Sequence, residues 1–577
     1  MAFDLFHGRK LTISGTQAQM LEQARLRLVW VVMVMMMGYI AIILRMGDLS
    51  LLHHKSTPML TNNSAMALNE RPLRASIVDR NGNLLAVSLR MASVYVNAKM
   101  VHDPANLAQK LAPILPTQSY DDLFKKLSSG KGFVWLQRFI TPRQEYAINA
   151  LGDPALRFQE EQRRIYPDAN LAAQVIGYTD TDSHGIAGIE KFFNKRLAAG
   201  GKPLQLTLDM RIQHIMRQDL AKSVKKFHAL GGAGIVMDAN TGQVIAMVSL
   251  PDFDPNHIGD ATNAEKFDRA TLGDYEMGST FKTFSIAAGL DSGKVHLYSV
   301  FDASHPLKID RFTIHDFDAK NRPLTIPEIF IYSSNIGTSK MAQSLEPDTI
   351  ENFYRTLGFM QQVPIQVPER AMPIYPSPWR PINTLTAAFG HGIAVSPLHV
   401  VRAASAIVNG GMLLKPTLVM PDDPNVAPEG TRVISAETSE KMRRMLELVV
   451  AGGTGSNAWV KGYDVGGKTG TADKNKNGKY ESHANISSFL GVFPIWHPRY
   501  VVLALLDDPQ GTKATYGFST GGFTAAPVVG DVIARMGPLY GIKPRMDITR
   551  NGIEKEMKPY LKEYKEGQLL AALSTDH

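Results

Sequence analysis

The sequence contains no cysteine among its 577 residues. This absence excludes a disulfide framework, a thiolate metal site and a cysteine nucleophile. It is compatible with an oxidising compartment without requiring one. The chain also shows no internal repeat, no low-complexity linker and no basic–aromatic cluster of the kind that binds nucleic acid. We therefore expect no nucleic-acid partner, no metal and no cofactor.

The length of the chain is too great for a single compact core, so two or more domains are expected. Hydrophobic residues make up 44% of the sequence and charged residues 20%, which is ordinary for globular protein. The net charge of +8 is modest for this length. It would favour anionic lipid or cell-wall polymer, but scattered surface lysines and arginines are the simpler interpretation.

Residues 28–44 (LVWVVMVMMMGYIAIIL) carry no charge. As a helix, these 17 residues span about 26 Å, which suffices for a slightly thin bilayer core. A signal peptide is the alternative, but its apolar region is usually shorter, and RMGD at 45–48 is a poor cleavage site. We favour an uncleaved transmembrane helix. The basic residues before it predict that residues 1–27 are cytoplasmic and that the rest of the chain lies outside.

Residues 45–226 show mixed signals and no pair of groups that looks catalytic. Residues 76–88 (SIVDRNGNLLAVS) predict two short strands around Asn81-Gly82, which is a strong hairpin signal. Three segments predict helices, the last after a loop: 107–115, 120–127 and 185–197. We expect a mixed α+β pedestal domain without catalytic function, of the kind that serves as a spacer or in docking and dimerisation.

A second domain is predicted from residue 227 to 545, followed by a charged tail at 546–577. Residues 233–238 and 243–248 predict two strands joined by a turn, and a long irregular stretch at 251–274 follows. The tail is expected to be a surface helix or partly disordered.

The stretch YEMGSTFK at 275–282 predicts a turn that enters a helix over 283–290. Ser279 and Lys282 are three residues apart and would share one helix face. A serine needs a base to become a nucleophile, and a lysine whose pKa is lowered by burial and a second cation can supply it. Backbone N–H groups at the helix start would stabilise negative charge beside the serine. Alone this signal is weak, since S-x-x-K recurs at Ser128/Lys131 and Ser223/Lys226.

A second polar group, Ser333-Ser334-Asn335, falls in a break between helix-like segments at 327–331 and 338–345. On such a turn the Ser333 hydroxyl can pass a proton, and the Asn335 amide can hold a substrate carbonyl. Viewed in isolation, these residues would more simply be helix caps.

A third group, Lys468-Thr469-Gly470-Thr471, predicts an edge strand with Lys468 and Gly470 on one face. Such an edge can offer its backbone to an extended peptide, with the lysine attracting a carboxylate. An isolated K-T-G is more simply a strand end. A loop is expected at 473–482, and strands at 486–493 and 500–506 would complete an antiparallel sheet.

In this order and spacing, the three groups resemble those of penicillin-binding proteins and serine β-lactamases. Most of the chain after residue 45 is similar to class B penicillin-binding proteins, and most to their septal, division-specific type. The matching segments are 74–82 (RASIVDRNG), 164–167 (RIYP), 175–190, 206–213, 389–397, 452–455 (GGTG), 462–472, 521–522 and 525–527. The sequence departs from the family at three positions: Ala75 where glycine is usual, Asp268 where asparagine is common, and Met277 where proline is usual.

The resemblance implies a transpeptidase domain of the β-lactamase-like α/β type, an antiparallel sheet flanked by helices. It implies that Ser279 is the acylated nucleophile and Lys282 its base, while Ser333 and Lys468 relay the proton to the leaving amine. Asn335 would hold the peptide amide and Thr469 the substrate carboxylate, on the strand that includes Gly470. Backbone N–H groups of Ser279 and Thr471 would form the oxyanion hole.

The same resemblance implies the partners. The substrates would be peptidoglycan stem peptides ending in D-Ala-D-Ala, and β-lactams would be inhibitors. A SEDS-class glycosyltransferase (FtsW) and other membrane proteins of the division machinery would be partners. The catalytic domain would lie outside the inner membrane, which the chain crosses once.

Four alternatives compete with this interpretation. A β-lactamase would need a second base for water, and no Glu-x-x-Leu-Asn motif is convincing here. A penicillin sensor would need several membrane segments or a cytoplasmic output domain, and a scaffold without catalysis conflicts with the intact motifs. The elongation-specific class B enzyme is the closest competitor. Chain length and the resemblance of residues 473–509 favour the septal type.

Overall fold

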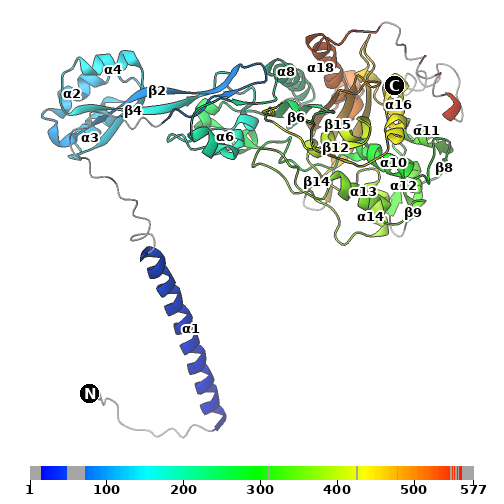
Figure 1. Cartoon of the computed structure of the whole chain (residues 1–577), viewed down its shortest axis with the longest axis horizontal. Helices are drawn as coiled ribbons and strands as arrows, with labels where there is room; N and C mark the ends of the chain where they lie inside the picture. Colours follow the sequence, from blue (N-terminus) through cyan, green and yellow to red (C-terminus); the bar gives the residue numbers. More distant parts are fainter. Residues whose placement is uncertain are drawn as a thin grey trace. The chain divides into compact units, whose positions relative to one another are not determined.

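The computed structural model describes residues 15–47, 72–309, 312–423, 426–476, 479–545, 549, 552, 555 and 558–561. The chain divides into two units, residues 1–71 and 72–577 (Figure 1). The expected C-terminal tail at 546–577 lies mostly outside the described residues, and η7 (Lys558–Tyr560) is a short element within it.

The first unit contains one described element, the helix α1 (Gly15–Gly47). The apolar run at 28–44 lies inside this helix, and its large side chains are exposed, Trp30 by 58% and Ile43 by 64%. Among the residues that the structure describes, no helix meets both the length and the hydropathy required for a membrane crossing. The membrane anchor expected at 28–44 stays a prediction.

The second unit begins with a sheet of strands β1 (Ile77–Val78), β2 (Leu84–Val96), β3 (Val134–Ile140), β4 (Leu156–Ile165) and β5 (Leu204–Gln205). The long strand β2 pairs antiparallel with β1, β3 and β4, and runs beside β4 for most of its length (Figure 1). The hairpin predicted around Asn81-Gly82 is present, because Gly82 takes a φ of 88° and the Asp79 carboxylate accepts the amide of Asn81 at 2.8 Å.

Three short helices pack on one face of this sheet: α2 (Pro104–Leu111), α3 (Tyr120–Leu127) and α4 (Pro142–Asn149). Each helix begins after a capping side chain that accepts a first-turn amide, namely Asp103, Ser119 or Thr141. The helix α3 has its predicted bounds, whereas α2 is shifted toward the N-terminus because Pro104 follows the Asp103 cap. The segment at 185–197 forms α6 (Gly188–Phe192) and α7 (Asn194–Ala198).

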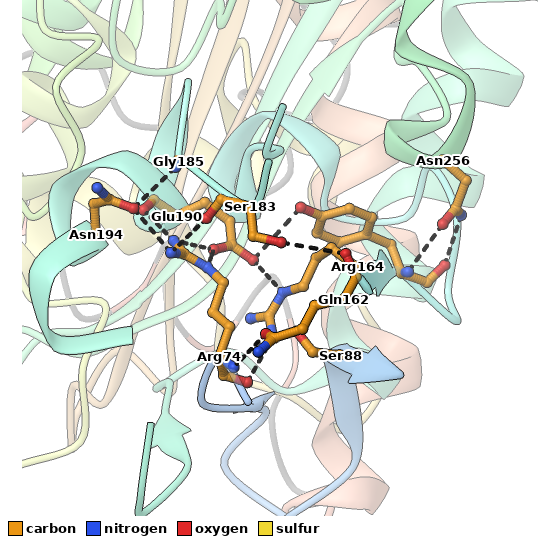
Figure 2. Close-up of polar contacts among 10 residues, drawn as sticks. Arg74, Ser88, Gln162, Arg164, Ser183, Gly185, Glu190, Asn194 and Asn256 are labelled. Carbon is orange, nitrogen blue, oxygen red and sulfur yellow. Dashed lines mark hydrogen bonds and ion pairs between the residues drawn. The ribbon is translucent and has the colours of Figure 1, made fainter. Parts of the chain in front are cut away.

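A buried ion network joins three of the segments that carry the family resemblance (Figure 2). The Glu190 carboxylate accepts from Nε of Arg74 at 2.7 Å and from Nε of Arg164 at 2.7 Å. The side chains of all three residues are at most 1% exposed. Arg74 also donates to the Ser183 carbonyl and to Asn194 Oδ1. The network ties strand β4 and helix α6 to the segment that precedes β1.

The second sheet contains β6 (Gly231–Asp238), β7 (Val244–Leu250), β14 (Gly466–Lys476), β15 (Lys479–Phe493) and β16 (Tyr500–Asp507). Its order is β14-β15-β16-β6-β7, and every neighbouring pair is antiparallel. The prediction that the K-T-G segment forms an edge strand is therefore confirmed. The predicted loop at 473–482 is wrong in extent, since β14 and β15 continue through it to the Lys476–Lys479 pair.

Helices cover both faces of this sheet. On strand β16, Val502, Ala504 and Leu506 pack in a core with α8 (Met210–Lys226) and α18 (Ala526–Leu539). The alternate residues Val501 and Leu503 face α10 (Lys282–Asp291), α15 (Pro397–Val408) and α16 (Ala436–Gly452). The helix α8 lies before the expected border at residue 226, yet it packs on the second sheet. The antiparallel sheet between helices agrees with the predicted transpeptidase fold.

The remaining elements of the second unit are short. They are α5 (Ala173–Ile176), η2 (Ala98–Met100), η3 (Pro255–Asp260), α9 (Asn263–Lys266), η4 (Gly278–Phe281), β8 (Val300–Asp302), β9 (Leu307–Ile309), β10 (Phe312–Ile314), β11 (Pro323–Thr325), α11 (Ile326–Ile331), α12 (Asn335–Gln343), α13 (Thr349–Leu357), α14 (Pro381–Ala387), β12 (Met412–Leu414), β13 (Gly430–Arg432), η5 (Ser456–Ala458), η6 (Lys513–Thr515) and α17 (Gly521–Thr524).

Candidate active site

Ser279 lies in the one-turn helix η4, immediately before α10 begins at Lys282. The turn requires Gly278, because its φ is 50° and a Cβ there would lie 2.3 Å from the Thr471 carbonyl oxygen. The Nζ of Lys282 lies 2.8 Å from Oγ of Ser279. Lys282 is fully buried, so its amine is held beside the serine in a site with little water.

The segment Ser333-Ser334-Asn335 forms the break between α11 and α12, as the sequence predicted. Ser333 adopts a φ of 59°, an unusual value for a residue with a side chain, and Asn335 is the first residue of α12. The Lys282 Nζ donates to the Ser333 carbonyl at 2.6 Å and to Asn335 Oδ1 at 2.7 Å. It also lies 3.2 Å from Ser333 Oγ.

These contacts are compatible with the neutral amine that the lowered pKa of Lys282 favours. A carbonyl and an amide oxygen accept only, so they take the two hydrogens of a neutral amine. The nitrogen lone pair is then left for the hydroxyl proton of Ser279, which is the geometry that a general base requires. The Asn335 amide is held in the matching orientation because its Nδ2 donates to the His315 carbonyl at 3.0 Å.

Strand β14 brings a second buried lysine to the same turn. The Nζ of Lys468 donates to Ser333 Oγ at 3.0 Å and to the Thr469 carbonyl at 3.2 Å. Burial lowers the pKa of Lys468 to about 7. Burial also holds the pKa of Lys282 well below its usual value, the charge of Lys468 lowers it further, and Asp316 opposes them. Burial and a second cation, the two factors expected to activate the lysine base, are therefore both present.

The rest of the K-T-G segment lies along the edge of β14. Gly470 allows this strand to approach the serine turn, since a Cβ there would meet the Met277 carbonyl at 2.4 Å. Thr469 is 8% exposed and its hydroxyl lies 2.8 Å from that of Thr454. Thr471 is exposed, and its hydroxyl accepts the amide of Gly521 at 3.1 Å.

The structure thus brings the predicted site residues together. Hydrogen bonds connect Ser279, Lys282, Ser333, Asn335 and Lys468 in one network, and the strand of Lys468 carries the other three, Thr469, Gly470 and Thr471. The roles assigned to these residues stay predictions.

The two competing S-x-x-K copies lie elsewhere in the fold. Ser223 donates its hydroxyl to the Thr524 carbonyl, and Ser128 donates to the Phe124 carbonyl at the end of α3. Each hydroxyl is thus bonded to a backbone carbonyl.

Three residues near the site were not predicted. Thr454 contacts Thr469, and Asp316 contacts the Ser333–Asn335 turn. Glu276 accepts from the Tyr480 hydroxyl at 3.1 Å and pairs with His391 at 3.4 Å beside the serine turn. Thr454 lies in the GGTG segment, which was noted only for its resemblance. No local signal marks Asp316, because its contacts come from a chain segment that folds back on α12.

This arrangement can perform acyl transfer. A serine with a neutral amine 2.8 Å from its oxygen can attack a carbonyl and form a covalent ester. The second lysine and Ser333 provide a route for a proton to a leaving nitrogen.

Comparison with known proteins agrees with this chemistry. Residues 232–534 match the family described as penicillin binding protein transpeptidase domain, and residues 69–210 match the penicillin-binding protein dimerisation domain. A probable peptidoglycan D,D-transpeptidase FtsI of Caulobacter vibrioides is 38% identical over 82% of this chain and 83% of its own length. Stage V sporulation protein D of Bacillus subtilis is 30% identical over 92% of this chain and 88% of its own.

A solved structure shows the same fold. Penicillin binding protein 3 of Mycobacterium tuberculosis, complexed with aztreonam, aligns with a TM-score of 0.66 at 25% identity. The alignment covers 82% of this chain and 97% of that structure. The family models and the curated relatives both cover the greater part of the chain. The chain therefore belongs to the class B penicillin-binding proteins, with a dimerisation domain and a transpeptidase domain.

Proposed function

We propose that the chain is a peptidoglycan D,D-transpeptidase that cross-links stem peptides through an acyl-enzyme on Ser279. The observation that carries this function is the contact between the Lys282 amine and the Ser279 hydroxyl at 2.8 Å, made by an amine that also contacts the Ser333 carbonyl and Asn335 Oδ1. The transpeptidase-domain match and the names of the relatives support the same activity.

In the first half-reaction, Ser279 Oγ attacks the carbonyl of the penultimate D-Ala, and Lys282 takes the hydroxyl proton. The backbone N–H groups of Ser279 and Thr471 stabilise the oxyanion, a contribution of about 100- to 1,000-fold per donor. The C–N bond then breaks. The terminal D-Ala leaves as an amine that receives a proton through Ser333 and Lys468.

In the second half-reaction, the amine of a neighbouring stem peptide attacks the ester carbonyl. The new amide bond forms as the Ser279 oxygen leaves and regains its proton. During the first half-reaction, Thr469 holds the carboxylate of the terminal D-Ala and Asn335 holds the peptide amide. A β-lactam presents a carboxylate and a strained amide to the same groups, so it acylates Ser279 and stays there.

The activity is tested by incubating the purified full chain with a synthetic stem pentapeptide and an acceptor peptide bearing a free amine. Mass spectrometry follows release of D-Ala and formation of the cross-linked product. We expect both products from the wild type and neither from Ser279→Ala. Hydrolysis without cross-linking, at any acceptor concentration, would contradict transpeptidation.

The septal role rests on resemblance, including the FtsI relative, and we propose division rather than elongation as the setting. Another relative is named as a sporulation protein, so the cellular setting has to be tested directly. Depletion in the source bacterium separates the two roles, since loss of a division enzyme gives filaments and loss of an elongation enzyme gives rounded cells. Rescue by wild type but not by Ser279→Ala ties the phenotype to the site.

We also propose that residues 28–44 anchor the chain in the inner membrane and that FtsW is its glycosyltransferase partner. The uncharged run and the basic residues before it support the anchor. Removal of residues 1–44 is expected to release the protein from membranes that otherwise resist alkaline extraction. Retention of the truncated chain would contradict the anchor. Co-purification of full-length chain with FtsW tests the second proposal, and its absence from mildly solubilised membranes would count against it.

A further inference from the structure

The segment His315-Asp316, which follows strand β10, lies against the turn that carries Ser333 and Asn335. The Asp316 carboxylate accepts the Ser334 hydroxyl at 2.6 Å through Oδ2 and the Ile336 amide at 2.9 Å through Oδ1. The neighbouring His315 carbonyl accepts Nδ2 of Asn335. His315 and Asp316 therefore contact residues 334–336, which form the end of the turn and the start of α12.

These contacts decide where the turn lies. Ser334 caps α12 by accepting the Gly337 amide at 2.9 Å, and it is 2% exposed. Its hydroxyl proton goes to Asp316, so the carboxylate fixes the rotamer of the cap. The Ile336 amide would otherwise be one of the unpaired donors of the first helical turn. A negative charge here is also favourable for the helix dipole.

The turn needs such support because Ser333 is held in the left-handed region, which is strained for a residue with a side chain. The carbonyl of Ser333 and the amide oxygen of Asn335 are the two acceptors that orient Lys282. A shift of the turn would move both acceptors at once. The amine of Lys282 would then lose its alignment with Ser279.

We propose that Asp316 is a positioning residue of the acylation site, which holds the Ser333–Asn335 turn in register and sets the charge balance around Lys282. This inference rests on the proposed transpeptidase function. The charged groups that act on Lys282 are Lys468 from β14 and Asp316 from the segment after β10; Ser279, Ser333 and Asn335 add neutral contacts. The negative charge of Asp316 raises the pKa of Lys282, whereas the positive charge of Lys468 lowers it. Removing the charge of Asp316 therefore lowers the pKa of Lys282 further.

The test is the rate constant for acylation of the full chain by a penicillin, measured against pH for wild type, Asp316→Asn and Asp316→Glu. A turn displaced by about 1 Å lowers the rate about 100-fold, so we expect a loss of this order in Asp316→Asn. The acidic limb of the pH–rate profile of Asp316→Asn, where the rate rises as the base loses its proton, should also move to lower pH, because Lys282 loses its proton more readily. Asp316→Glu should return the limb toward the wild-type position while the plateau stays low.

Asp302→Asn is the matched control. This carboxylate contacts α12 through Lys340 at 3.5 Å rather than through the helix start, and its pKa of about 2 keeps it ionised throughout the assay. Its variant should match the wild type. Ser334→Ala removes the bridging hydroxyl, and its effect should not add to that of Asp316→Asn.

The outcomes separate the two claims. If the wild type forms no acyl adduct, the proposed function fails. If the wild type acylates and Asp316→Asn has an unchanged rate and limb, only the role of Asp316 is wrong. A rate loss that follows the folded fraction in thermal unfolding, without a shift of the limb, would also overturn the positioning role.

Discussion

Lys282 and Lys468 reach the same hydroxyl, with their Nζ atoms 3.2 Å and 3.0 Å from Oγ of Ser333. Two buried amines beside one small group cannot both stay charged at low cost. Burial lowers the pKa of both lysines, and the charge of Lys468 lowers the pKa of Lys282 further. Lys282 can thus act as a base toward Ser279, and in the proposed reaction Lys468 and Ser333 pass a proton to the leaving amine.

The first prediction concerns the charge of Lys468. In Lys468→Met, the pKa of Lys282 should rise because a neighbouring cation is removed, so the acidic limb of penicillin acylation should move to higher pH. The plateau rate should fall by about 100-fold or more, since a proton-transfer group is lost. Stopped-flow measurement of acylation against pH checks both effects.

Lys340→Met is the control for this prediction, since Lys340 makes only a partly exposed pair with Asp302 at 3.5 Å. It should leave rate and limb unchanged. If the acidic limb of the acylation rate stays at the same pH in Lys468→Met, Lys468 does not influence the pKa of Lys282.

The second prediction concerns the pair Thr454–Thr469, whose hydroxyls are 2.8 Å apart. Thr454→Val leaves the Thr469 hydroxyl without this partner, so the carboxylate of the substrate or antibiotic should bind about 3- to 10-fold more weakly. The saturation constant for acylation should rise while the limiting rate changes little. Thr454→Ser should restore binding, and a loss confined to the limiting rate would refute this role.

The third prediction concerns Asp268, which is buried. The Thr271 hydroxyl faces both Asp268 Oδ2 at 2.9 Å and the Glu369 carbonyl at 2.6 Å, although it has one proton to donate. A protonated Asp268 or an asparagine would donate to Thr271 and remove this competition. Burial raises the pKa of Asp268 to about 6.

Because the folded-state pKa of Asp268 is raised, the native state prefers the protonated acid, and stability declines as pH rises from about 4 to about 6. Asp268→Asn does not titrate and should be more stable than the wild type by about 2–3 kcal/mol above pH 6. The difference should vanish near pH 4. Denaturant unfolding at several pH values tests this, and a pH-independent difference would contradict it.

The fourth prediction concerns the ion network of Figure 2. Glu190→Gln leaves Arg74 and Arg164 buried without their counter-charge, so the free energy of unfolding should fall by about 3–5 kcal/mol. Glu160→Gln is the control, since its pair with Arg90 is exposed and should contribute less than about 1 kcal/mol. Equal effects of the two substitutions on thermal unfolding would be inconsistent with this network.

The features predicted best from the sequence are those that depend on residues close together in the chain. The hairpin at Asn81-Gly82 and the helix α3 follow from a turn dipeptide and an N-cap at Ser119. Strand β14 was predicted as an edge from its glycines and its place in the motif. The family motif then supplied the site residues that local patterns left ambiguous.

Contacts between distant segments escaped prediction. Asp316 contacts Ser334 from a position 18 residues earlier in the chain, and no periodic pattern in the sequence predicts such a contact. The extension of β14 and β15 through 473–482 was missed because lysines and asparagines suggested a loop. The helix α8 lies before the border predicted at residue 226 but packs on the second sheet, since its apolar face is completed by α18 from a distant part of the chain.

The measurement that tests the central claim most directly is intact-mass spectrometry of the full chain after addition of penicillin, beside Ser279→Ala. We predict a single adduct that persists, maps to Ser279 and is absent from the variant. An adduct that decays within seconds, with penicillin consumed catalytically, would indicate a β-lactamase. No adduct on folded wild-type protein would contradict the assignment of Ser279 as the nucleophile.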